Sequence, residues 1–124
     1  MATILMVEDN AANMTLALYV LESAGHRVLS ATDAEAGLAL ARSERPDLIL
    51  MDIQLPGMDG LEATAQLKRD ETTRAIPVIA LTALAMKGDE ERIMAAGCDG
   101  YIAKPMRYKE LLATVADQLA ARQE

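Results

Sequence analysis

The stretch LILMDIQLPGMDG, residues 48–60, decides the fold of this chain. Its first four residues are all apolar, and the run ends abruptly at Asp52. A run that is apolar at every position, instead of at alternate positions, is typical of a strand buried on both faces, as in a parallel sheet. Similar runs at residues 4–7 and 78–81 also end at polar residues. These three runs therefore predict the central strands of a parallel sheet.

Helical patterns separate the apolar runs along the whole chain. Between residues 11 and 24, Met14, Leu18 and Leu21 recur at helical spacing, and Gly25 can end that helix. With two weaker strand candidates, the order is a strand followed by a helix, repeated five times. Five such units predict an α/β fold with a doubly wound parallel sheet, helices on both faces and right-handed crossovers. The weaker strand candidates are residues 28–31 and 101–103.

Two further helices carry recognisable signals. One begins at a capping box and runs to about residue 69, and the last helix shows a single apolar stripe. The capping box is Asp59 with Glu62, and the stripe consists of Tyr108, Leu112, Val115 and Leu119. We see no linker, so we expect residues 1–124 to form one domain with no output domain.

Composition narrows the class of protein. The 124 residues are 52% hydrophobic and 25% charged, which is typical of a globular domain. The formal net charge of -7 argues against a nucleic-acid-binding face. Cys98 is the only cysteine, which excludes an internal disulfide and suits a reducing compartment. No signal peptide fits the N-terminus, and no apolar run approaches the ~18 residues that span a membrane. We therefore expect a cytoplasmic protein without membrane contact.

Polar residues gather where the buried strands end. Glu8 and Asp9 follow the first run, Asp52 follows the third, and Thr82 follows the fourth. The carboxyl ends of parallel strands share one edge of the sheet, where open α/β folds bind ligands. Three carboxylates at one edge repel each other, and a divalent cation resolves that conflict. Oxygen ligands with no histidine or cysteine nearby favour Mg²⁺ over zinc. Each acid alone could equally be a solvated strand end or a helix cap.

Lys104 adds a cation at the end of the fifth strand. It can pair with a phosphoryl oxygen or with the Asp52 carboxylate. Pro105 follows it directly, and the sequence leaves open whether the bond between them is cis or trans. Thr82 offers a hydroxyl, and the small Ala83 beside it leaves room for a group the size of phosphate.

The segments VEDN (7–10), LILMDIQLPGMDG (48–60), PVIALTA (77–83) and GYIAKP (100–105) resemble those of the response regulator receiver domains of two-component signalling. The resemblance covers nearly the whole chain. The stretch AMKGDEERIMAAGCDGYIAKP, residues 85–105, is most similar to the single-domain DivK-type regulators, although receivers of hybrid histidine kinases share similar wording. The resemblance implies the flavodoxin-like receiver fold, with sheet order 2-1-3-4-5.

The resemblance also implies a role for each site residue. Asp52 would accept the phosphoryl group, and Thr82 and Lys104 would bind it. Thr82 and Tyr101 would form the conformational switch, with residues 84–96 as the element that shifts. Mg²⁺ would be the cofactor, and its ligands would be Asp9, Asp52, Glu8 through water, and the backbone carbonyl of Gln54.

The implied partners are proteins. A histidine kinase or a histidine phosphotransfer protein would donate the phosphoryl group, and downstream protein targets would read it. The chain would be a monomer or a weak phosphorylation-linked dimer, and not a classical enzyme, although it takes part in its own phosphorylation and dephosphorylation. The first helix has a wide apolar arc that could be the docking face or could simply be buried; its extra members are Ala11, Ala12, Leu16 and Val20.

Three alternatives compete with this interpretation. In one class of phosphatase, an aspartate of the enzyme itself becomes phosphorylated, and a second aspartate lies two residues after it. In this chain, the residue two after Asp52 is Gln54. A flavodoxin-like nucleotide binder needs a glycine-rich first loop, whereas residues 8–10 are acidic and contain no glycine. An interaction module that is never phosphorylated would have no use for Thr82 and Lys104 beside the acidic set.

Overall fold

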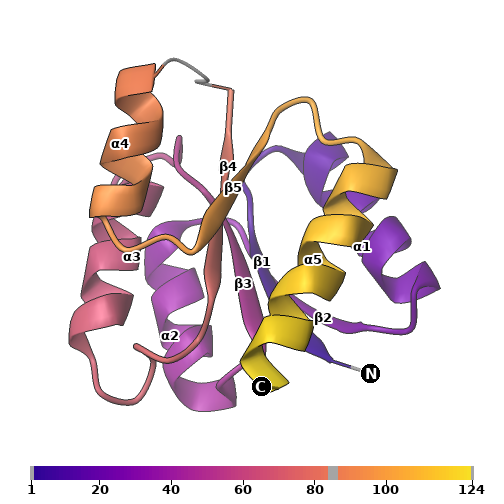
Figure 1. Cartoon of the computed structure of the whole chain (residues 1–124), viewed down its shortest axis with the longest axis horizontal. Helices are drawn as coiled ribbons and strands as arrows, with labels where there is room; N and C mark the ends of the chain where they lie inside the picture. Colours follow the sequence, from indigo (N-terminus) through magenta and orange to yellow (C-terminus); the bar gives the residue numbers. More distant parts are fainter. Residues whose placement is uncertain (1, 84–86, 124) are drawn as a thin grey trace.

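Alternating apolar runs and helical patterns produce five strands and five helices in the computed structural model, which describes residues 2–83 and 87–123 (Figure 1). In chain order the elements are β1 Thr3–Val7, α1 Ala11–Ser23, β2 Arg27–Ala31, α2 Ala34–Glu44, β3 Leu48–Asp52, α3 Gly60–Arg69, β4 Val78–Thr82, α4 Lys87–Ala95, β5 Gly100–Ala103 and α5 Tyr108–Gln123.

The five strands form one parallel sheet in the order β2-β1-β3-β4-β5, which confirms the predicted fold. Helices cover both faces of the three central strands β1, β3 and β4. The residues of these strands are accordingly apolar at nearly every position. The edge strands β2 and β5 each begin one residue before the predicted start, at Arg27 and Gly100. Among the described residues, no helix is both long enough and apolar enough to cross a bilayer.

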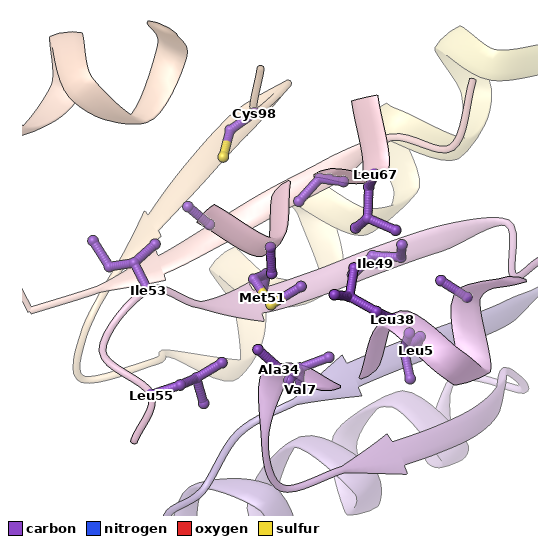
Figure 2. Packing of buried hydrophobic residues seen from close by; sticks show 14 of the residues in the cluster. Leu5, Val7, Ala34, Leu38, Ile49, Met51, Ile53, Leu55, Leu67 and Cys98 are labelled. Atoms are coloured by element: carbon purple, nitrogen blue, oxygen red, sulfur yellow. The ribbon is translucent and has the colours of Figure 1, made fainter. Parts of the chain in front are cut away.

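Two hydrophobic layers hold the helices on the sheet. Figure 1 shows α2, α3 and α4 on one side of the sheet, and α1 and α5 on the other. Alternate residues of each central strand serve opposite layers, so that Ile49 and Met51 face the first side whereas Leu50 faces the second. Figure 2 shows the first layer, where these two side chains lie among Leu38 and Leu67. Each large side chain buried in this way contributes roughly 1.5–3 kcal/mol of transfer free energy.

Helix starts agree well with the sequence signals. The Asn10 side chain caps α1 by accepting a hydrogen bond from the Asn13 N–H at 2.9 Å. The predicted cap of α3 is confirmed, because the Asp59 carboxylate accepts from the Glu62 N–H at 2.8 Å. Both caps lie at the edge of the sheet where the strands end, and they fix how each helix leaves that edge.

The structure decides one open question about the predicted helix faces and corrects one detail. Val20 is buried with Ala17, which is the burial that the sequence left open for the apolar arc of α1. On α5 the buried residues are Leu111 and Val115, whereas Tyr108 is 55% exposed. The predicted stripe is wrong only at its first member: Leu112, Val115 and Leu119 pack on the core as predicted, and Leu111 is buried in place of Tyr108.

Two side chains, Lys68 and Asp99, hold the end of the sheet where the strands begin. Lys68, at the end of α3, donates from Nζ to the carbonyl of Ile76 at 2.9 Å and to the Asp99 carboxylate at 3.0 Å. The same Asp99 oxygen accepts from the Val78 N–H at 2.8 Å. Lys68 and Asp99 therefore join α3 to the beginnings of β4 and β5.

Candidate functional site

Polar side chains from four strand ends meet at one edge of the sheet. Glu8 and Asp9 follow β1, Asp52 ends β3, Thr82 ends β4, and Lys104 follows β5. One carboxylate oxygen from each of the three acids lies within 4.8 Å of the others. The Lys104 Nζ lies 2.9 Å from the Asp52 carboxylate and 3.0 Å from that of Glu8. The predicted constellation is therefore assembled in the fold.

Asp52 lies at the bottom of the site and is only 2% exposed. Its two carboxylate oxygens have different partners: Oδ1 accepts from the Gln54 N–H at 2.9 Å, and Oδ2 accepts from Lys104. Hydrogen bonds and a charged partner of this kind fix the orientation of a buried carboxylate. The side chain is thus held in one orientation within the acidic cluster. Gln54 lies beside this carboxylate, and the metal-binding role of its carbonyl stays a prediction.

Glu8 is completely buried and has an uneven environment. Its Oε1 accepts from Asn13 Nδ2 at 2.8 Å and from Lys104 Nζ, whereas its Oε2 is buried and accepts no hydrogen bond from the described residues. Burial raises the pKa of the Glu8 carboxyl group, Asp52 raises it further, and Lys104 and Asn13 oppose this. A buried carboxylate oxygen without a partner is costly, so the site suits a cation that would bind it.

Lys104 is the counter-charge of the two buried acids. Partial burial lowers the pKa of its ammonium group, but the hydrogen bonds that it donates to Asp52 and Glu8 outweigh burial and hold that pKa above its usual value. The Lys104 N–H also donates to the carbonyl of Thr82 at 2.7 Å, which fixes the backbone between β4 and β5. The bond from Lys104 to Pro105 is cis, which answers the question that the sequence left open.

Thr82 and Tyr101, the predicted switch residues, lie on neighbouring strands. Thr82 is fully buried at the end of β4, whereas the Tyr101 ring on β5 is 36% exposed. The Tyr101 hydroxyl donates to the Glu90 carboxylate on α4, and this hydrogen bond raises the pKa of the phenol. Of the predicted shifting segment, residues 84–86 lie outside the described residues, and most of the remainder forms α4.

The exposed face of α1 begins directly beside the acidic site. Ala11 and Ala12 are exposed in its first turn, and Leu16, one turn further on, is 44% exposed. An apolar groove of 430 Å³ continues from this face to α5, where Tyr108 and Leu112 line it. The predicted apolar face of α1 is therefore present, and Val20, although buried, also lines the groove.

Sequence reasoning missed two residues that contact the site residues. Asn13 binds Glu8, and Glu90 binds Tyr101. The spacing of Asn13 from the Asn10 cap could have suggested that its side chain points back toward the end of β1. No sequence signal identifies Glu90, because its contact depends on how α4 lies against β5.

Known proteins share both the sequence and the fold. A profile of the response regulator receiver domain matches residues 4–116. The polar-differentiation response regulator DivK of Brucella anthropi is 49% identical over 117 residues, which cover 94% of this chain and 95% of that protein.

Solved structures agree with this similarity. The receiver domain of a sensor histidine kinase from Pseudomonas aeruginosa, solved with a magnesium ion coordinated in its active-site cleft, is 39% identical with a TM-score of 0.89. The similarity covers 96% of this chain and 98% of that one. The chemotaxis protein CheY4 of Vibrio cholerae is 28% identical with a TM-score of 0.90, covering 94% of this chain and 98% of that one.

Proposed function

This chain belongs to the family of response regulator receiver domains, and from that premise we propose that it is a phosphorylation switch in which Asp52 accepts the phosphoryl group. The observation that carries the proposal is the state of Asp52, which is buried, bound by Lys104 at 2.9 Å and adjacent to two further acids. A carboxylate held in this way is a fixed nucleophile, because its orientation is set before the donor arrives.

Mg²⁺ is the cofactor that the proposal requires. Asp9, Asp52 and Glu8, together with the carbonyl of Gln54, would hold it, and the unpaired Glu8 oxygen and the purely oxygen donor set fit a hard cation. When bound, the ion supplies positive charge that offsets the negative charge of the phosphoryl oxygens during transfer.

The side chains of this chain supply the rest of the reaction. A carboxylate oxygen of Asp52 attacks phosphorus in line with the bond to the donor's imidazole nitrogen. The new O–P bond makes an acyl phosphate, the N–P bond breaks, and its electron pair returns to the imidazole. Lys104 already contacts Asp52 and would pair with a phosphoryl oxygen after transfer. The Thr82 hydroxyl would donate to another.

Removing Mg²⁺ tests the proposed function. Incubated with acetyl phosphate and Mg²⁺, the chain should gain the mass of one phosphoryl group, as measured by intact-protein mass spectrometry. With excess EDTA, the initial rate should fall on the order of a hundredfold, because a metal ion contributes several kcal/mol of transition-state stabilisation. A rate that is the same in EDTA would show that the acidic cluster does not use a metal.

The donor would be a histidine kinase or a histidine phosphotransfer protein that docks on the exposed face of α1. In the same experiment, Ala12→Asp should slow transfer from a phosphorylated phosphotransfer protein but leave labelling by acetyl phosphate unchanged. Ala39→Asp, on an exposed position of α2 behind the sheet, is the matched control. If the parent, Ala12→Asp and Ala39→Asp proteins all accept the phosphoryl group at the same rate, the α1 face has no part in docking.

We propose that Thr82 and Tyr101 transmit the phosphorylated state. Thr82 would move toward the phosphoryl oxygens and Tyr101 would turn inward, which requires its hydrogen bond to Glu90 to break. Such a change is a shift between two populations, driven by the different affinity of the phosphoryl group for each. With Mg²⁺ and the phosphate mimic beryllofluoride, NMR contacts between the Tyr101 ring and Glu90 should disappear. Contacts that persist in the loaded protein would contradict the inward movement.

A further inference from the structure

The two oxygens of Glu8 are treated differently by their surroundings. Oε1 accepts two hydrogen bonds, from Asn13 Nδ2 at 2.8 Å and from Lys104 Nζ at 3.0 Å. Oε2 is buried and accepts none within residues 2–83 and 87–123. Lys104 also binds Asp52, whereas Asn13 donates its side-chain amide to Glu8 and to no other acid among the described residues.

Asn13 is itself fixed by the start of α1. Its backbone N–H donates to the Asn10 side chain at 2.9 Å, and the next N–H, that of Met14, donates to the Asn10 carbonyl at 2.9 Å. These two bonds place Asn13, the third residue of α1, beside the end of β1. From there its side chain reaches Glu8. The loop of Glu8, Asp9 and Asn10 is therefore held at both of its ends, and Asp9 lies exposed between them.

We propose that Asn13 is a positioning residue for the metal site, which holds Glu8 by Oε1 so that Oε2 is presented to the divalent cation. The proposal rests on the proposed function, because it takes the acidic cluster to be the site of Mg²⁺. Without the amide, Oε1 would retain only the bond to Lys104, and the carboxylate would be free to rotate about it. Residues that orient a metal ligand in this way change metal affinity by roughly 10–100-fold when they are removed.

The test compares Mg²⁺ affinity in matched variants by isothermal titration calorimetry. Asn13→Leu removes the donor but keeps a side chain of similar size, and its Mg²⁺ dissociation constant should rise at least about tenfold. Gln66→Leu removes a side-chain amide from α3 and leaves the contacts of Glu8 in place, so its affinity should stay within about twofold of the parent. If Asn13→Leu fails to fold by circular dichroism, Asn13→Ala removes the donor without adding bulk and takes its place.

Labelling by acetyl phosphate provides a second measurement that a purely structural role would not affect in the same way. The Mg²⁺ concentration that gives half-maximal labelling should rise by the same factor, whereas the rate at saturating Mg²⁺ should remain close to that of the parent. An Asn13 variant that binds Mg²⁺ as tightly as the parent would overturn the positioning role alone. A parent chain that neither binds Mg²⁺ nor becomes labelled would instead overturn the proposed function.

Discussion

An Asp52→Asn variant is expected to take up no phosphoryl group from acetyl phosphate, even with saturating Mg²⁺. The amide is too weak a nucleophile to replace the carboxylate, although it has nearly the same shape. Its single oxygen can accept from Lys104 or from the Gln54 N–H, and its NH2 group cannot accept the other bond. The fold should survive, because the change removes one of three neighbouring negative charges. The pKa of Glu8, which Asp52 raises, should fall toward its ordinary value.

The matched control for this variant is Asp33→Asn. Asp33 caps α2 away from the acidic cluster, and asparagine is an equally good cap, so the same chemical change should leave labelling intact. Mass spectrometry on both variants and the parent under one set of conditions provides the comparison. Labelling of Asp52→Asn at the rate of the parent would show that another residue accepts the phosphoryl group.

The second large effect is expected for Gly60→Ala, at the start of α3. A Cβ atom at residue 60 would lie 2.2 Å from the carbonyl oxygen of Asp52 and 2.7 Å from the Cα of Ile53. Both are backbone atoms, so the strand end and the helix must move apart. We expect the free energy of unfolding to fall by roughly 3 kcal/mol, the upper part of the range for overpacked cores. Because the clash involves Asp52 directly, labelling of the folded protein should slow as well.

Gly88→Ala is the control for this second variant. Gly88 lies in the first turn of α4, where an added Cβ would meet nothing within 4 Å. Alanine there should increase the free energy of unfolding by up to about 1 kcal/mol, because it favours the helix more than glycine does. Urea titrations followed by circular dichroism measure both changes. A Gly60→Ala protein as stable as the parent would mean that the junction of β3 and α3 is more adaptable than its spacing indicates.

The central strands could be predicted from the sequence because they are buried on both faces. Their uninterrupted apolar runs are only four residues long and end at polar residues, which favours buried strands over buried helices. The edge strand β2 is partly exposed, and its polar residues Arg27 and Ser30 weaken the same signal, so its start was misplaced by one residue. For α5, spacing alone could not distinguish Tyr108 from Leu111 as the buried residue, because that depends on how the helix is rotated against the sheet.

The positions of the central site residues could also be predicted from the sequence. Strand ends place Asp9, Asp52 and Lys104 at one edge as soon as the sheet is known to be parallel. For Asn13, the spacing from the Asn10 cap suggests a direction toward β1 but does not identify Glu8 as its partner. The contact of Glu90 has no signal in the sequence, because it depends on the position of α4 relative to β5. Positions that follow from topology could thus be predicted, whereas contacts that depend on helix docking required the coordinates.

The fastening of the opposite edge by Lys68 and Asp99 bears on how the molecule can respond. Because these two side chains hold α3 to the beginnings of β4 and β5, the sheet has a fixed point at the end remote from Asp52. A change at the carboxyl ends of the strands would then rotate β4 and β5 about their fixed beginnings instead of shifting the whole sheet.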